Sequence, residues 1–141
     1  MLTTYPACFF KEENGYSVIF PDLEIGTCGD DLDDSIAMAI DCLAGYIYIS
    51  QRDNDYIPPA SKLSDIDISE IGKDTYDDET DYSESFVNMI SVDVEAYAKE
   101  HFEKSVKKTL TIPKWLNELA LEQNINFSQV LQEALLAKVK Q

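Results

Sequence analysis

The segment from Val106 to Val139 limits the possible folds of this chain more than any other stretch. It predicts one short strand, from Val106 to Ile112, followed by two amphipathic helices. A segment this short cannot bury a sufficient core by itself. We therefore expect it to form a dimer.

Alternation along the predicted strand separates two faces. Lys107, Thr109 and Thr111 form a polar face with one positive charge. The opposite face is apolar except for Lys108, and we expect it to pack on the helices. Its apolar members are Val106, Leu110 and Ile112.

Local signals mark the ends of the two helices. Pro113 suits the first turn of the first helix, and Asn124 can adopt the left-handed conformation that ends it. Asn126 is the expected cap of the second helix, with Gln129 completing a capping-box pattern. The helices add these residues to the expected dimer core: Trp115, Leu116, Leu119, Val130, Leu131 and Leu135.

A dimerising strand-helix-helix unit is the layout of a ribbon-helix-helix DNA reader, in which two paired strands enter the major groove. Lys107, Thr109 and Thr111 would then contact base edges. The free N–H groups near Phe127 and Ser128 would hold a phosphate. The alternative is an exposed edge strand, blunted by lysine and threonine, on a helical hairpin that only dimerises.

The N-terminal part predicts a small antiparallel sheet. Thr3–Phe10 and Tyr16–Phe20 are strand-like and are separated by Asn14-Gly15, whose residues both accept positive φ. We expect further strands at about 26–29 and 86–94.

A helix should follow the third strand, capped by Asp30 or Asp31 and ending near Arg52-Asp53-Asn54. Its apolar positions recur every three or four residues, so it should cover one face of the sheet. The predicted fold class is α+β, an antiparallel sheet with one packed helix. The stripe consists of Leu32, Ile36, Ala39, Ile40, Leu43 and Ile47.

Two segments lie outside the predicted strands and this helix: a connector inside the domain at about 1–100, and a linker to the tail at 105–141. The first, at about 55–85, holds six acidic residues and two tyrosines among the eleven residues 74–84. We interpret it as a mobile acidic loop with little to bury. The second, at about 95–104, is helix-prone and should link the two domains.

Charge separates the domains as well. Residues 1–100 carry 23 acidic and 5 basic side chains, a formal charge of −18, whereas residues 101–141 carry 4 and 6, a charge of +2. The first part should repel nucleic acid and attract a basic partner, and the second tolerates phosphate. An acidic surface can also serve solubility alone.

Further sequence features indicate the cellular compartment of the protein. Three cysteines, Cys8, Cys28 and Cys42, are odd in number and lack a CxxC spacing, which fits buried thiols in a reducing compartment. The N-terminus lacks signal-peptide features, and no apolar run approaches a membrane helix. We expect a cytoplasmic protein without membrane contact.

An enzyme is the main rival class, because clustered carboxylates can hold divalent metals for nuclease chemistry. The acidic residues here fall mostly at turns and helix starts, and no HExxH-type or DxD-type spacing occurs. The single histidine, His101, lies in the predicted linker helix. We expect no catalytic residues, no metal site and no cofactor.

The order of these features resembles the HicB antitoxin family. Nearly the whole chain except the acidic loop takes part, and the evidence is the ordered combination. Two departures are Asn124, where the family often has glycine, and Phe127, where it often has arginine. The residues that carry the resemblance are Phe20-Pro21-Asp22-Leu23, Gly29-Asp30, Ile36–Ile47, Thr111-Ile112-Pro113, Ser128 and Glu133-Ala134.

This resemblance implies a partial ribonuclease-H-like N-terminal domain without nuclease activity, which blocks a small basic mRNA-cleaving toxin, HicA. It implies that the tail binds operator DNA and represses its own operon, as a homodimer or a tetramer. Charge complementarity would speed toxin binding. Our candidate toxin contacts are Asp22, Glu24, Asp31 and Asp34, for which helix capping and solubility are equally good roles. A pure adaptor that dimerises without touching DNA remains the alternative.

Overall fold

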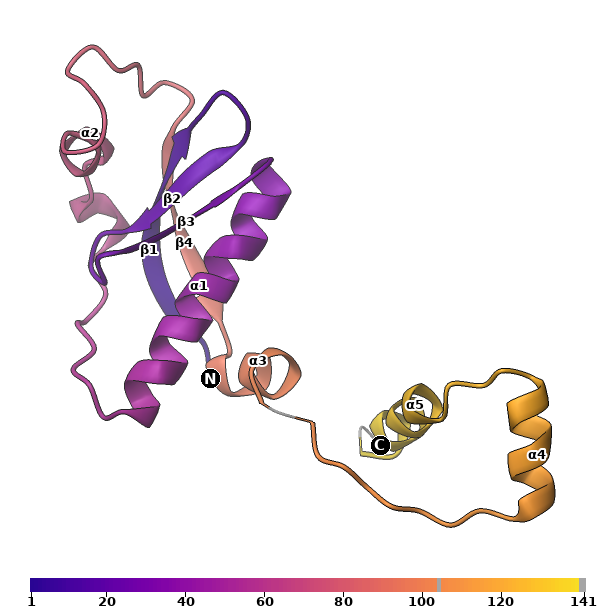
Figure 1. The fold of residues 1–141 in the computed structure, drawn as a ribbon. Coiled ribbons are helices and arrows are strands. Elements are labelled where there is room, and N and C mark those ends of the chain that lie inside the picture. The colour runs from indigo at the N-terminus through magenta and orange to yellow at the C-terminus, as the bar shows by residue number, and fades with distance from the viewer. Residues whose placement is uncertain (104, 140–141) are drawn as a thin grey trace. The chain divides into compact units, whose positions relative to one another are not determined.

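The computed structural model describes residues 1–103 and 105–139. The chain divides into two compact units, Met1–Lys104 and Ser105–Gln141 (Figure 1). The first contains a sheet with its own core, and the second contains two helices.

The first unit is built on a four-stranded sheet of order β3-β2-β1-β4, in which every neighbouring pair is antiparallel. The strands are β1 (Thr3–Lys11), β2 (Tyr16–Phe20), β3 (Ile25–Gly29) and β4 (Phe86–Val92). The antiparallel sheet expected from the strand-like runs and the Asn-Gly turn is confirmed, and so is the α+β class.

The turn between β1 and β2 differs in detail from the prediction. Gly15 adopts a φ of 82°, but Asn14 is not in the left-handed region. The backbone N–H of Glu12 donates to Gly15 O at 3.1 Å. Only glycine fits at position 15, because an added Cβ would lie 1.9 Å from Gly29 O.

Helix α1 (Leu32–Arg52) covers one face of the sheet, as its apolar stripe predicted. Asp31 is its N-cap and accepts from Asp34 N at 2.7 Å. The core side chains between α1 and the sheet are almost fully shielded from solvent. They include Ala7, Phe9, Val18, Phe20, Ala39, Leu43, Ala44 and Ile47.

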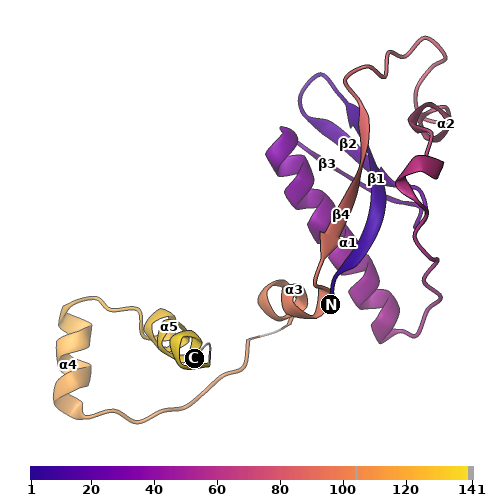
Figure 2. The same ribbon diagram turned by 180° about the vertical axis from the view of Figure 1, so that it is seen from behind.

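The later part of the connector 55–85 lies on the other side of the sheet from α1, whereas Ile57, near its start, packs against the core on the α1 side (Figures 1 and 2). The connector contains η1 (Leu63–Asp65) and α2 (Ile68–Gly72). Tyr76 and Tyr82 pack against the buried Phe10, with ring centroids 5.2 and 6.1 Å away. The expectation that this segment has little to bury is therefore wrong, because its tyrosines cover the second face of β1.

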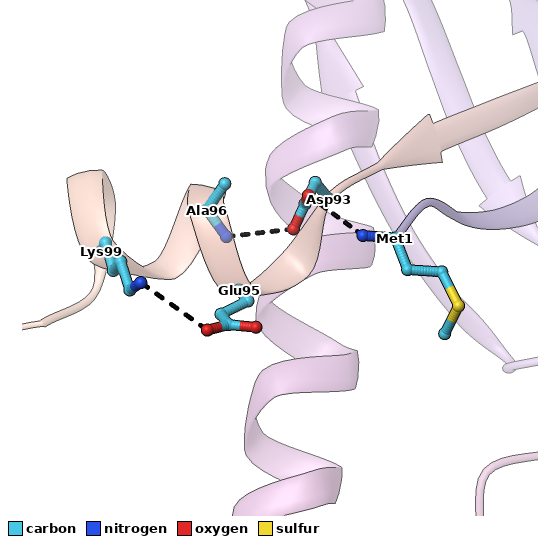
Figure 3. Close-up of polar contacts among 5 residues, drawn as sticks. All are labelled: Met1, Asp93, Glu95, Ala96 and Lys99. Carbon is cyan, nitrogen blue, oxygen red and sulfur yellow. Dashed lines mark hydrogen bonds and ion pairs between the residues drawn. The ribbon is translucent and has the colours of Figure 1, made fainter. Parts of the chain in front are cut away.

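Helix α3 (Val94–His101) packs against α1 and belongs to the first unit. The Tyr97 hydroxyl donates to Asp41 Oδ1 at 2.9 Å, and Phe102 lies against Tyr48. Asp93 caps α3 by accepting from Ala96 N, and it also accepts from the Met1 ammonium (Figure 3). The predicted linker helix is thus fixed to the sheet domain.

The second unit contains α4 (Lys114–Glu122) and α5 (Phe127–Val139). Pro113 is the N-cap of α4, one position before the first turn to which the sequence assigned it. Asn124 adopts a φ of 54° after α4, as predicted. Val106–Ile112 forms no strand in this single chain.

Candidate functional site

The second unit exposes its apolar side chains. No residue from 105 to 139 is buried, whereas the first unit has a full core. Trp115 is 66% exposed and Leu110 is 64% exposed. Apolar area left in water is unfavourable by about 25 cal/mol per Å², so this surface favours association.

The predicted dimer residues fall into two groups in this unit. One group lines an open groove of about 620 Å³ between the helices and the preceding segment. Val106, Trp115, Leu119 and Leu135 are exposed outside the residues that line the groove. The predicted residues in the groove are Leu110, Ile112, Leu116, Val130 and Leu131.

The predicted DNA-contacting residues are also divided. Lys107, Thr109 and Thr111 are exposed and do not line the groove. Phe127 and Ser128, assigned from sequence to a phosphate contact, line the groove beside Leu131. This position gives Phe127 an apolar environment and suits a packing role.

Val106–Ile112 lacks a strand for a physical reason. A strand needs a neighbour to receive its backbone N–H and C=O groups, and the described part of the second unit offers only helices. A second copy of the same segment would supply that neighbour. The strand therefore remains a prediction about the dimer.

The start of α5 follows the sequence in part. The Asn126 side chain accepts from Gln129 N at 3.1 Å, as a cap should. The Gln129 side chain, however, donates to Glu133 at 3.1 Å. The reciprocal half of the predicted capping box is replaced by this contact along the helix.

The structure shows the local surroundings of each residue predicted to contact the toxin. Asp22 accepts from Ser61 N at 2.9 Å and from the Ser61 hydroxyl, which fastens the connector to the sheet. Asp31 caps α1, and Asp34 accepts from Asp30 N at 2.9 Å. Glu24 is exposed in the left-handed region with φ 54°. Asp31, Asp34 and Glu24 still present charge to solvent.

Sequence reasoning missed the anchors of the acidic segment 74–84. The Tyr76 hydroxyl donates to the Glu12 carboxylate, and burial together with this bond raises the Tyr76 pKa to about 12. Tyr82 packs against both Tyr76 and Phe10. The available signal was two tyrosines inside a strongly acidic run, since aromatic rings favour burial.

The described residues contain no group of three His, Cys, Asp or Glu side chains gathered to hold a metal. His101 stacks on Tyr97 with ring centroids 4.1 Å apart. Within the same part of the chain, no helix has the length and apolar character needed to cross a membrane.

Comparison with known proteins gives consistent matches. Residues 5–139 match the model of a HicB-like antitoxin of bacterial toxin-antitoxin systems. A toxin-antitoxin complex from Streptococcus pneumoniae contains a chain 33% identical, with 98% of this chain and 99% of that chain covered and a TM-score of 0.63. The Burkholderia pseudomallei antitoxin HicB is 17% identical over 95% and 96% of the two chains, with a TM-score of 0.47. A HicA3–HicB3 toxin-antitoxin complex is 18% identical over 62% of this chain and 94% of that chain, with a TM-score of 0.48. No curated protein matches the chain.

Proposed function

The chain belongs to the HicB-like antitoxin family of bacterial toxin-antitoxin systems, and from this premise we propose a two-part function. The first unit binds and neutralises a HicA-type toxin. The second unit forms a homodimer, binds operator DNA and represses its own operon. The protein acts in the cytoplasm as an inhibitor and regulator, without catalysis of its own.

Charge supports the first part of the proposal. A ribonuclease must hold phosphates, so its substrate site is basic, and the −18 charge of residues 1–100 is complementary to it. The related complex from Streptococcus pneumoniae is a toxin-antitoxin assembly. The exposed carboxylates of Glu24, Asp31 and Asp34 are candidate contacts, whereas Asp22 mainly holds Ser61.

The observation that carries the second part is the exposed apolar surface of the second unit. Leu116, Val130 and Leu131 line an open groove that a second copy would fill. Pairing of the two Val106–Ile112 segments would then place Lys107, Thr109 and Thr111 on the outer face of a ribbon suited to the major groove. Two such dimers side by side would compensate for the small number of basic residues.

A salt-titrated gel shift with the DNA upstream of its own gene tests this function. We expect specific retention that weakens steeply with salt and is lost in Lys107→Ala and Thr109→Ala. Lys138→Ala, which changes an α5 residue outside the polar face, is the matched control. Toxin inhibition should survive both ribbon substitutions.

Truncation after residue 103 separates the two activities. The truncated chain keeps the complete sheet core, so it should neutralise toxin but fail to repress. If the truncated chain still repressed the operon, the assignment of DNA binding to the tail would be wrong. Absence of DNA retention by the full chain, with toxin bound or not, would leave a dimeric adaptor.

A further inference from the structure

The two edges of the sheet in the first unit differ in how their backbone groups are satisfied. In an antiparallel sheet, alternate residues of a strand direct their N–H and C=O groups to opposite neighbours. The Glu12 N–H donates to Gly15 O, which makes that pair hydrogen-bonded. The register then places the hydrogen-bonded pairs between β1 and β2 at Phe10↔Ser17 and Cys8↔Ile19.

The same alternation identifies the groups that face outward. Even-numbered residues of β2 pair with the odd-numbered residues of β3, so Gly26 and Cys28 direct their N–H and C=O groups to the open edge. On the opposite edge, odd-numbered residues of β4 face outward, including Met89. Pro6 fits this register, since it lacks an N–H and is not required to donate to β4.

The β4 edge is protected. The Asn88 side chain accepts from the outward Met89 N–H at 2.9 Å, and η1 contacts this strand. A side chain that occupies an edge N–H prevents pairing with another strand.

Helix α1 packs against β3, but no side chain of the described residues occupies an outward N–H group of this strand. Its sequence, Ile25-Gly26-Thr27-Cys28-Gly29, contains no lysine, proline or charged residue. Gly26 and Cys28 are exposed. Among the described residues, the side-chain contact to the outward groups is a weak one, from Cys42 Sγ to Gly26 O at 3.8 Å.

Negatively charged side chains lie at both ends of β3. Glu24 precedes β3, and four aspartates follow it, all exposed. An extended segment lying along the five residues of β3 would span roughly 17 Å and bring its ends close to these carboxylates. A basic segment therefore fits better than an acidic one. The aspartates are Asp30, Asp31, Asp33 and Asp34.

We propose that β3 is the toxin-docking edge of this antitoxin, to which an extended basic segment of the HicA-type toxin adds as a fifth strand. Backbone hydrogen bonds to Gly26 and Cys28 supply affinity, and the flanking carboxylates select a basic segment. This inference rests on the proposed toxin-neutralising function. It assigns that function to a particular edge of the sheet.

Amide hydrogen exchange on the full chain, alone and mixed with its HicA-type toxin, tests the assignment. We expect the Gly26 and Cys28 amides to exchange quickly in the free chain and to be protected in the complex. The Ser91 amide, which faces outward on β4, is the internal control and should not change. Co-elution of chain and toxin reports separately whether a complex exists.

A pair of substitutions at one position complements the exchange measurement. Cys28→Pro removes the outward N–H, and Cys28→Ser keeps it. We expect Cys28→Pro to bind toxin about tenfold more weakly than Cys28→Ser. If Cys28→Pro fails to fold, exchange in the unmodified chain still decides the matter.

The outcomes that overturn the proposal are distinct. Co-elution without protection of Gly26 and Cys28 would place the toxin elsewhere and leave the antitoxin function intact. Protection that appears without toxin, and grows with protein concentration, would assign the edge to a second copy of this chain. Absence of any complex would remove the toxin-neutralising function and this inference with it.

Discussion

The Tyr76 hydroxyl donates to the Glu12 carboxylate across 64 residues of sequence. Glu12 also accepts from the Ser17 hydroxyl at 2.9 Å, and the Tyr76 ring lies 5.2 Å from that of Phe10. These contacts attach the acidic segment 74–84 to the β1–β2 hairpin. The attachment holds the segment and its carboxylates in place, so less conformational entropy is lost when a partner binds.

Removing this anchor should destabilise the first unit. Tyr76→Phe deletes the hydrogen bond and should lower the free energy of unfolding by about 1 kcal/mol. Tyr76→Ala also deletes the ring and should lower it by about 3 kcal/mol. Urea denaturation measures both, with the highly exposed Tyr56→Phe as the control. Equal stability of Tyr76→Ala and the unmodified chain would show that the anchor contributes nothing.

Asp22 should behave as a structural residue. Asp22→Ala removes both acceptors of Ser61 and should lower the free energy of unfolding by about 2 kcal/mol, since the bonds involve a charged group. Toxin affinity, measured by calorimetry below the melting temperature, should stay unchanged. Asp65→Ala, an exposed aspartate of η1, is the control. Loss of affinity without loss of stability would return Asp22 to the toxin contacts.

Local signals explain what the sequence could predict. The β1–β2 hairpin, the Asp31 cap and the apolar stripe of α1 depend on residues within a few positions of one another. The acidic segment was misjudged because Tyr76 finds its partners, Glu12 and Phe10, more than sixty residues earlier. Composition alone indicated a loop and could not reveal those contacts.

The candidate site residues also divide into those that local patterns could place and those that depend on contacts with distant residues. Alternation assigned Lys107 and Leu110 to opposite faces of a predicted strand; Leu110 lines the groove and Lys107 does not, but the strand itself stays a prediction. Helical spacing could not decide whether Phe127 faces a phosphate or the groove, since a residue in the first turn can do either. Asp22 was selected for its charge, and its bond to Ser61, 39 positions away, has no sequence signature.

The three cysteines should react at different rates. Burial raises the Cys8 pKa to about 11, and burial followed by the charge of Asp41 raises the pKa of Cys42. The thiolate is the reactive form, so the exposed Cys28 should be modified first by a disulfide reagent and Cys8 only on unfolding. Cys28→Ser should lack the fast phase. A fast phase that survives this substitution would contradict the assignment.

The pH dependence of stability should include Asp93. The Ala96 N–H, and next the Met1 ammonium, hold the pKa of this carboxyl below its ordinary value. A lowered pKa gives stabilisation that is present above the unfolded-state pKa and is lost as pH falls through the folded-state pKa. The midpoint temperature of thermal unfolding, measured from pH 7 to about 2, should therefore fall less steeply below about pH 4 in Asp93→Asn than in the unmodified chain. Asp55→Asn is the control, and identical acid profiles for Asp93→Asn and the unmodified chain would contradict the prediction.

Dimerisation should depend on the groove of the second unit. Leu131 lines this groove, and Leu131→Lys would place a charge where the second copy packs, a cost of several kcal/mol for an unpaired buried charge. Sedimentation should show a single chain for Leu131→Lys and a dimer for the matched control, Gln132→Lys, whose side chain is exposed. DNA retention should be lost together with the dimer, while toxin binding by the first unit, which has its own core, should persist. A Leu131→Lys protein that still sediments as a dimer would place the dimer interface outside the groove.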